Sequence, residues 1–345
     1  MTSTHIDVRA IDFDALGAWM DEQGLPAGAF ERVEPVAGGT QNIMVRFDRG
    51  GASYVLRRPP LHPRARSNEV LRREARVLAM LRDTPVAAPR LIAACTDETV
   101  MSGAVFYLME PVRGFNATVG LPEPHAGDPA IRHRMGLEAA LALAELGRVD
   151  HGGLDGFGRP EGFLERQVPR WTGELETYSA LDGYPGPEIP GLTQTAGWLE
   201  RNRPRVFSPG VMHGDYHLAN LMFAYDGPRV AAIVDWEMCT VGDPLLDLGW
   251  LLATWPAPDG GGTLVGGTPG IAGLPAVKEI VECYTALSDR DTSAIDWYTV
   301  LACFKLGIIL EGTHARACAG MAPKDIGDLL HATALSLFAR ARSFM

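Results

Sequence analysis

The sequence predicts an α+β fold with two lobes: a small antiparallel β-sheet lobe with one key helix, and a larger lobe that is mainly helical. Residues 31–58 contain short apolar segments separated by glycine-containing turns, which is typical of an antiparallel meander. Beyond residue 130, most segments have apolar residues at helical spacing. A chain of 345 residues with 46% hydrophobic content can bury two separate cores. The predicted lobes are residues 1–110 and 111–345.

The elements expected in the small lobe are, in order, an amphipathic helix within residues 6–24, a strand meander over 31–58, a second helix over 67–82 and a strand over 104–112. In the first helix, Ile11, Leu16 and Trp19 are the candidate core contacts. The segment Asp48-Arg49-Gly50-Gly51 is expected to form a hairpin turn. The chain is expected to cross into the large lobe at Pro111–Gly114.

The elements expected in the large lobe are a buried strand over residues 230–234 and helices over 130–149, 192–202, 297–314 and 324–344. The sequence Asp243-Pro244 is a favourable helix start, with Asp243 as the cap and proline in the first turn. Residues 256–273 form a glycine-rich insertion. This insertion is either a lid over a binding site or a surface loop.

Charge and cysteine usage limit the possible partners. The formal net charge of -11 and the pI near 5.3 argue against broad binding to nucleic acid or to anionic membranes. The N-terminal residues lack a basic region followed by an apolar core, and no window is expected to be apolar enough to span a membrane. The five scattered cysteines are expected to be free thiols. These observations predict a cytoplasmic protein.

A cluster of polar residues after residue 211 has the spacing that phosphoryl transfer requires. Asp215 and Asn220, within the segment that begins His213-Gly214-Asp215, are separated by four residues. Asp235 ends the apolar run Val230–Val234. Phosphoryl transfer needs a carboxylate near the attacking hydroxyl and oxygen ligands for a divalent cation. The spacing therefore predicts Asp215 as the catalytic base, with Asn220 and Asp235 as magnesium ligands.

Two other interpretations of these residues remain open. Asp235 alone is equally typical of a turn or cap after a strand. The cluster His213, Asp215 and His217 could instead bind zinc in a metal-dependent hydrolase. That second interpretation leaves Asn220 and Asp235 without a role.

On these motifs the chain resembles the aminoglycoside phosphotransferase and choline kinase-like family, which has a protein-kinase-like fold. The resemblance implies a kinase that transfers phosphate from ATP or GTP to a small hydroxyl-bearing substrate, with Mg²⁺ as cofactor. It implies that residues 1–110 bind the nucleotide and that 111–345 carry catalysis and the acceptor site. It also implies that His213 orients the loop, and that Asp247 braces the loop by accepting backbone hydrogen bonds near His213.

The nucleotide site is expected in the small lobe. Gly38, Gly39 and Thr40 lie between two strands, where glycines would let backbone amides approach phosphate, although such a pair is also common in a plain hairpin. Arg57 stands where related kinases have lysine. Glu74 falls on the apolar face of the second helix, so an ion pair with Arg57 is expected unless Glu74 extends to solvent.

Backbone groups near Glu110 and Val112, at the end of the last strand, are expected to contact the base of the nucleotide. The position of Arg57 leaves open a non-catalytic protein that binds nucleotide.

The sequence indicates the identity of the phosphate acceptor less directly than it indicates the catalytic residues. Residues 163–171 and 305–316 resemble a subgroup similar to the kinase domain fused to some acyl-CoA dehydrogenases. These segments contain the cations Arg166, Arg170, Lys305, His314 and Arg316. If two or more of them line the cleft, they favour an anionic acceptor, such as a hydroxy acid or its coenzyme A thioester, over a polycationic aminoglycoside. The alternative is that they form surface salt bridges. The sequence makes no prediction of oligomeric state.

Overall fold

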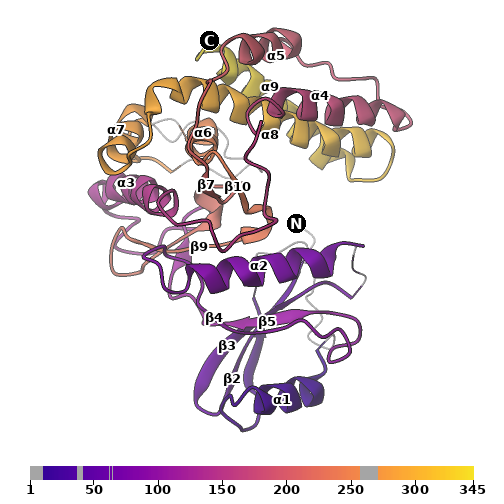
Figure 1. The fold of residues 1–345 in the computed structure, drawn as a ribbon, viewed down its shortest axis with the longest axis vertical. Coiled ribbons are helices and arrows are strands. Elements are labelled where there is room, and N and C mark those ends of the chain that lie inside the picture. Colours follow the sequence, from indigo (N-terminus) through magenta and orange to yellow (C-terminus); the bar gives the residue numbers. More distant parts are fainter. Residues whose placement is uncertain (1–10, 37–41, 62, 64, 257–270) are drawn as a thin grey trace. The chain divides into compact units, whose positions relative to one another are not determined.

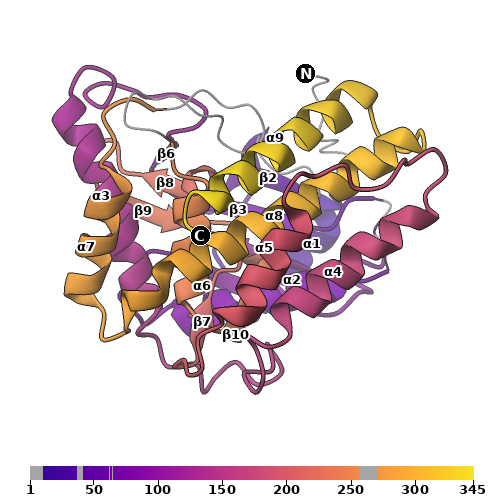
Figure 2. The same ribbon diagram turned by 90° about the horizontal axis from the view of Figure 1, so that it is seen from above.

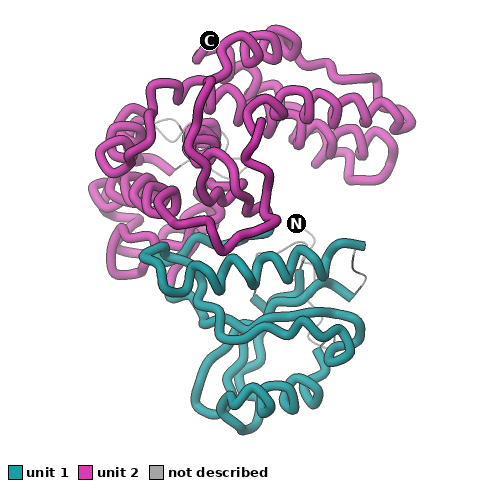
Figure 3. Tube along the Cα trace, viewed as in Figure 1, with its two compact units in different colours: residues 1–113, 231–237 teal, residues 114–230, 238–345 magenta. Residues whose placement is uncertain are grey.

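The computed structural model describes residues 11–36, 42–61, 63, 65–256 and 271–345 (Figure 1). These residues form two units, each with its own internal contacts (Figure 3). The small unit comprises Met1–Arg113 and Ala231–Glu237, and the large unit comprises Gly114–Val230 and Met238–Met345. The small unit therefore includes a seven-residue segment from far along the chain, which a division into two consecutive stretches cannot represent. The nucleotide-binding and acceptor-binding roles of the two lobes stay predictions.

The small unit is built on a five-stranded antiparallel sheet of order β1-β2-β3-β5-β4. The strands are β1 (Glu31–Pro35), β2 (Ile43–Arg49), β3 (Ala52–Arg58), β4 (Leu91–Cys95) and β5 (Phe106–Met109). The hairpin joining β2 to β3 turns at Gly50 and Gly51, whose φ angles of 57° and 79° lie in the left-handed region that glycine adopts most easily. The predicted meander is confirmed.

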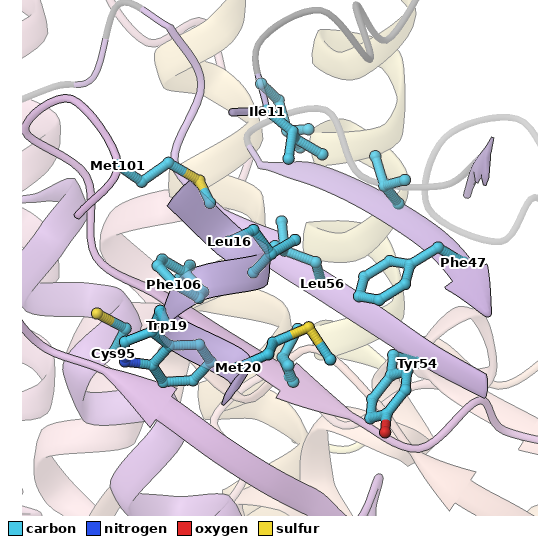
Figure 4. Packing of buried hydrophobic residues seen from close by; sticks show 13 residues of the cluster. Ile11, Leu16, Trp19, Met20, Phe47, Tyr54, Leu56, Cys95, Met101 and Phe106 are labelled. Atoms are coloured by element: carbon cyan, nitrogen blue, oxygen red, sulfur yellow. The ribbon is translucent and has the colours of Figure 1, made fainter. Parts of the chain in front are cut away.

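Two helices lie on opposite faces of this sheet, α1 (Phe13–Glu22) and α2 (Ser67–Leu81) (Figure 1). The side chain of Asp12 caps α1 by accepting hydrogen bonds from the amides of Asp14 and Ala15. The predicted contacts Ile11, Leu16 and Trp19 are buried in a core cluster on the α1 side, shown with its other members in Figure 4.

Successive side chains of β3 point to opposite faces of the sheet, so only alternate residues of this strand enter the core on the α1 side. Leu56 packs into the α1 cluster, so its neighbour Arg57 projects from the other face, the side of α2. That placement allows Arg57 to meet a residue of α2.

The large unit is mainly helical. Its helices are α3 (Pro129–Leu146), α4 (Gln167–Thr177), α5 (Leu192–Arg201), α6 (Leu245–Ala253), α7 (Val277–Leu287), α8 (Ile295–Cys318) and α9 (Lys324–Arg342). Figure 2 shows α8 alongside α9 and α3 alongside α7, and both pairs are in contact. The predicted helices are confirmed within a few residues at each end, whereas α4 and α7 were not predicted as helices.

Short strands connect the helical segments. β7 (Gly210–Met212) pairs with β10 (Thr240–Gly242), and β6 (Phe115–Asn116) pairs with β8 (Leu221–Phe223). β9 (Val230–Ile233) is the predicted apolar strand. The residue at the N-cap of α6 is Pro244, so Asp243, the predicted cap, lies one residue earlier. It is buried, accepts a hydrogen bond from the amide of Leu245 at 3.1 Å, and also accepts one from the hydroxyl of Tyr298 at 2.5 Å.

The expectation that no segment is apolar enough to span a membrane is wrong on composition. Within the described residues, one helical stretch, Thr292–Cys318, has the length and hydropathy of a membrane span. Most of it (72% of the apolar window) is buried inside the protein, as expected for the central helix of a folded unit. Its apolar character is therefore explained by packing.

None of the five cysteines is joined in a disulfide, as predicted. Residues 257–270 of the glycine-rich insertion lie outside the described residues, so both interpretations of that insertion stay predictions.

Candidate active site

The segment that contains the predicted catalytic residues connects β7 to β8. It begins at His213 directly after β7, and Asn220 is the last residue of the 3-10 helix η3 (Leu218–Asn220). Gly214 has a φ of 87°, and a Cβ atom there would lie 2.4 Å from the carbonyl oxygen of Met238. A side chain at residue 214 would therefore clash with backbone as well as strain the turn. This explains the glycine between His213 and Asp215.

Asp247 holds the start of this loop. Its carboxylate accepts hydrogen bonds from the amides of His213 at 2.6 Å and of Gly214 at 2.9 Å. The predicted brace is therefore present. Burial raises the pKa of Asp247 to about 7, against the two backbone hydrogen bonds, which lower it. A buried carboxylate that receives two amide protons fixes the backbone on which the catalytic side chains depend.

Three side chains of the large unit position the carboxylate of Asp215. Trp250 donates its indole Nε1–H to Oδ1 at 3.0 Å, and Nε2 of His217 lies 3.3 Å from the same oxygen. Asn220 Nδ2 lies 3.1 Å from Oδ2 and 2.9 Å from the backbone carbonyl oxygen of Asp215. The carboxylate is thus oriented by donors on both of its oxygens.

These donors also keep Asp215 ionised. Burial raises its pKa, but the hydrogen bond from His217 and any positive charge on that ring lower it. His213 and Lys305 act in the same direction, so the pKa lies at about 2. Asp215 is consequently an anion at every pH at which the protein is expected to work.

The hydrogen bonds of the two imidazoles define their tautomers. Nδ1 of His217 accepts from the amide of Ala219 at 3.2 Å, so the proton of the neutral ring lies on Nε2, which faces Asp215. Nδ1 of His213, a fully buried residue, accepts from the amide of Asp215 at 3.3 Å. Both Nδ1 atoms are therefore engaged by backbone, which disfavours the zinc-hydrolase interpretation. The role of His213 in orienting the loop stays a prediction.

Lys305 contributes a buried cation to this site. Its Nζ lies 4.6 Å from the ring centroid of Trp250 and 5.5 Å from that of Trp171. Burial lowers the pKa of Lys305 to about 8, against the opposing effects of Asp247 and Asp215, and the positive charge of Arg170 lowers it further.

The hydrogen bond from Trp250 was missed by sequence reasoning, whereas Lys305 was a candidate acceptor cation and is found close to the catalytic loop. For Lys305 a signal existed, since it is a single lysine in the otherwise apolar stretch Val300–Leu310. For Trp250 there was none, because a tryptophan among leucines reads as an ordinary core residue.

The small unit contains the second set of predicted residues. Arg57 Nε lies 3.1 Å from Glu74 Oε2, so the two side chains form an ion pair. Arg57 Nη2 donates to Asp235 Oδ1 at 3.0 Å. Glu74 is 1% exposed. The expected ion pair is present, and the alternative in which Glu74 extends to solvent is excluded.

Burial raises the pKa of Glu74 to about 7, although the positive charge of Arg57 opposes it. Burial lowers the pKa of Arg57, but Glu74 and Asp235 outweigh this effect and raise it. Arg57 therefore stays charged, and its guanidinium connects β3, α2 and Asp235, the second residue after β9.

Asp235 has a φ of 66°, in the left-handed region that aspartate and asparagine tolerate better than other residues. Its side chain is 41% exposed. Asn220, in the large unit, directs its amide nitrogen to Asp215, so its amide oxygen is the atom that can ligate a metal. A carboxylate and an amide oxygen are suitable ligands for Mg²⁺. Their assignment as metal ligands stays a prediction.

Only some of the other predicted nucleotide contacts lie within the described residues. Gly38, Gly39 and Thr40 lie outside the described residues. The amide of Glu110 donates to the carbonyl oxygen of Arg90 at 2.9 Å, so a base contact at Glu110 falls to its carbonyl oxygen. Val112 lies in the connection after β5.

The candidate acceptor residues do not form one cluster, although Arg170 and Lys305 both contact the ring of Trp171. Arg166 donates to the carbonyl oxygens of Glu161 and Arg159 next to it in the chain. Arg170 is exposed beside Trp171, and Arg316 is exposed and donates to Thr313 at 2.8 Å. His314 belongs to a separate cluster on α8 and α9.

Comparison with known proteins gives the chain a family. Residues 32–276 match the model described as the phosphotransferase enzyme family. The chain is 30% identical to acyl-CoA dehydrogenase family member 11 of Gallus gallus over 310 residues, which are 87% of this chain and 38% of that protein. It therefore spans less than two fifths of the length of this relative.

Solved structures show the fold. A provisionally assigned aminoglycoside phosphotransferase from Ralstonia eutropha JMP134 has a TM-score of 0.77 and 29% identity, covering 96% of this chain and 98% of that one. The GDP complex of aminoglycoside 2'-phosphotransferase-IIIa has a TM-score of 0.60 at 13% identity, over 94% and 97% of the two chains, and so is similar in fold alone. The predicted two-lobed, protein-kinase-like α+β fold is confirmed, and the chain belongs to the phosphotransferase enzyme family.

Proposed function

We propose that this phosphotransferase is a small-molecule kinase that transfers the terminal phosphate of ATP or GTP to a hydroxyl group. The observation that carries the proposal is the environment of Asp215. Its carboxylate is ionised, oriented by Trp250, His217 and Asn220, and mounted on a backbone that Asp247 fixes. A protein that only binds nucleotide has no use for such a carboxylate. A zinc hydrolase is disfavoured because Nδ1 of both His213 and His217 accepts a backbone hydrogen bond, and it would leave Asn220 and Asp235 without a role.

In the proposed reaction, the acceptor oxygen forms a bond to the terminal phosphorus as the bond to the leaving nucleoside diphosphate breaks. Asp215 accepts a hydrogen bond from the hydroxyl and takes its proton as the new bond forms. With a pKa of about 2, Asp215 is a weak base. It therefore orients the hydroxyl throughout and receives the proton late, when the attacking oxygen has become acidic.

The remaining roles follow from the donor chemistry. The guanidinium of Arg57, already held by Glu74 and Asp235, is suited to bind phosphate oxygens. Asn220 and Asp235 offer the oxygen atoms that would hold Mg²⁺, which when bound neutralises the charge of the phosphates.

For the acceptor we propose an anionic, hydroxyl-bearing molecule, such as a hydroxy acid or its coenzyme A thioester. One support is Lys305, a buried cation whose charge acts on Asp215. Another is the name of the relative from Gallus gallus, an acyl-CoA dehydrogenase family member. A polycationic aminoglycoside would meet repulsion from Lys305.

The test is magnesium-dependent transfer of labelled terminal phosphate from ATP and from GTP. The acceptors are pools of hydroxyacyl-coenzyme A thioesters, hydroxy acids, sugars, choline-like alcohols and aminoglycosides. We expect a labelled product from the first two pools.

Asp215→Ala and Asp215→Asn should lower turnover at least about 100-fold, the usual minimum for a general base, while nucleotide binding is retained. Product formed at an unchanged rate by Asp215→Ala would show that the base is assigned wrongly. Nucleotide binding without product from any pool would count against the kinase.

A further inference from the structure

Three side chains that the proposed kinase reaction does not use come together on the last two helices of the large unit. Glu311 and His314 lie one turn apart on α8, and His331 lies on α9. One ligand atom of each residue lies within 4.8 Å of the ligand atoms of the other two. Spacing of three or four residues on a helix directs two side chains to the same face, so α8 presents a carboxylate and an imidazole together.

Glu311 is the buried member of this cluster, with 0% of its surface exposed. Its Oε2 lies 2.7 Å from Nδ1 of His331, and Tyr184 donates its hydroxyl to Oε1 at 2.7 Å. Within the described parts of the chain, no lysine or arginine lies at ion-pair distance from Glu311. A buried carboxylate is costly unless a positive charge compensates it. Among the described residues, the group that faces this carboxylate at ion-pair distance is the imidazole of His331.

Tyr184 fixes the orientation of this carboxylate. Burial raises the pKa of Tyr184, and its hydrogen bond to Glu311 raises it further, so the phenol keeps its proton and remains a donor. The hydrogen bond occupies Oε1 and leaves Oε2 directed toward His331. Outer-shell hydrogen bonds of this kind orient the carboxylate ligands of protein metal sites.

The two imidazoles are stacked, with ring centroids 4.5 Å apart and an angle of 28° between the planes. The side chain of His314 is 15% exposed, and its Nδ1 is buried without a hydrogen-bond partner. Oδ1 of Asp328 lies 3.8 Å from that nitrogen. Nε2 of His314 lies 3.6 Å from the sulfur of Cys318. The cluster thus contains one buried ring nitrogen, Nδ1 of His314, that has no hydrogen-bond partner.

We propose that Glu311, His314 and His331 bind a divalent transition-metal ion of the Zn²⁺ type. Two imidazoles and one carboxylate form a donor set that suits Zn²⁺, Co²⁺ or Ni²⁺ and does not suit Mg²⁺, which prefers oxygen ligands. The ion supplies the positive charge that Glu311 otherwise lacks. It connects α8 to α9 and, through Tyr184, to the segment before α5.

The rearrangement needed for binding is small. Two ligands of one tetrahedral zinc ion lie about 3.3 Å apart, given zinc-ligand distances of about 2.0–2.1 Å. Oε2 of Glu311 and Nδ1 of His331 are closer than this, at 2.7 Å. Binding therefore replaces their hydrogen bond with bonds to the metal, and any proton that a ligating imidazole nitrogen carries is released to solvent.

The experiment uses the full chain after removal of metals with a chelator. Co²⁺ is titrated in while the visible absorption of the ion is followed, and Zn²⁺ affinity is measured by competition with a chromophoric chelator. We expect one ion per chain. We also expect Zn²⁺, and not Mg²⁺, to raise the melting temperature, because the ion binds the folded chain.

His331→Ala should weaken Zn²⁺ binding at least about 100-fold, since loss of even an outer-shell partner costs up to that much. The matched control is His133→Ala. His133 forms an exposed pair with Glu279 at 2.9 Å, which offers only two ligands, and its loss should leave binding unchanged. Cys318→Ser should also retain binding, because the sulfur is not among the three ligands.

Equal Zn²⁺ affinity in the wild-type protein and His331→Ala would overturn the proposal and leave a hydrogen-bonded network of histidine, glutamate and tyrosine. Loss of binding in His133→Ala or in Cys318→Ser would place the metal elsewhere. His314→Ala and Glu311→Gln provide second tests, with far-ultraviolet circular dichroism to verify that each variant is folded. Kinase activity is not a readout here, so failure of this proposal is distinguishable from failure of the proposed function.

Discussion

Asp215 is buried and yet has a lowered pKa. Burial alone would favour the neutral acid. The donors from His217 and Trp250 offset that cost by stabilising the anion at fixed positions. The result is a carboxylate whose lone pairs point in defined directions before any substrate arrives, which is the preorganisation that positioning in phosphoryl transfer requires.

Trp250→Phe removes one of these donors and keeps an aromatic ring beside Lys305. A hydrogen bond to a charged group contributes about 1.5–3 kcal/mol, so we expect kcat to fall about 10-fold or more. The matched control is Trp255→Phe, which removes a buried indole hydrogen bond to the carbonyl oxygen of Pro275 at 2.9 Å, away from Asp215. The control should lose stability with little change in kcat. Equal kcat values for the two variants would contradict the positioning role of Trp250.

Lys305, like Asp247 and Glu74, changes its charge state near physiological pH. Burial lowers its pKa to about 8, so it is a cation below about pH 8 and neutral above. If its charge assists an anionic acceptor, kcat/KM should decline as the pH rises through about 8. In Lys305→Met this decline should disappear and the plateau below it should be lower. Lys278→Met, at an exposed lysine of α7, should behave as the wild type. A decline near pH 8 that persists in Lys305→Met would assign it to another group.

At the scale of elements, α2 and β3 are joined through one buried pair. Glu74 projects from the apolar face of α2 and meets Arg57 of β3, and Arg57 also meets Asp235 after β9. The raised pKa of Glu74 indicates that the cost of burying its charge exceeds the attraction to Arg57. The pair is therefore better explained as a device that fixes the position of Arg57 than as a source of stability.

This interpretation gives a stability prediction with a definite sign. The folded-state pKa of Glu74, about 7, lies above its ordinary value of 4.5. Its contribution to the free energy of unfolding is thus fully present below about pH 4.5 and is lost as the pH rises through about 7. Glu74→Gln does not titrate. Urea unfolding should show the variant gaining stability relative to the wild type between about pH 5 and about pH 7.5.

The control for this experiment is Glu69→Gln on the exposed side of the same helix, where Arg66 lowers the pKa of Glu69. It should show no such gain. A stability difference for Glu74→Gln that does not vary with pH would mean that the pKa of Glu74 is not raised in the folded protein.

At the scale of the whole molecule, the proposed machinery is divided between the two units. The small unit holds Arg57, Glu74 and Asp235, and the large unit holds Asp215 and Asn220. Residues of the first set are expected to act on the nucleotide and its metal ion, and Asp215 is expected to act on the acceptor. Changes at Asp235 and at Asp215 should therefore give different kinetic signatures when they are made separately.

Asp235→Asn tests this division, because asparagine tolerates the φ of 66° and can still accept the hydrogen bond from Arg57. It removes a negative charge that would ligate Mg²⁺, so we expect the Mg²⁺ concentration at half-maximal rate to rise about 10-fold or more. Asp215→Asn should lower kcat without moving that concentration. The measurement is the initial rate over a Mg²⁺ titration for both variants. An unchanged Mg²⁺ dependence in Asp235→Asn would remove Asp235 from the metal site.

The sequence by itself determined the order of the principal elements and the fold class. Apolar periodicity located the meander and the long helices, because the periods of strand and helix differ. Local chemistry also predicted two tertiary contacts. A carboxylate on an apolar helix face required a cation, which proved to be Arg57, and the resemblance implied the amide bonds to Asp247.

Only the tertiary structure decided the rest of the site. Trp250, Lys305 and Asp215 come from three segments whose separation in sequence carries no periodic signal. His314, considered from sequence as an acceptor contact, lies instead with Glu311 and His331, because the packing of α8 on α9 sets which faces meet. The spacing of apolar residues in the sequence predicts which side of a helix is buried. The partner of each buried polar atom, however, depends on how separate helices pack together.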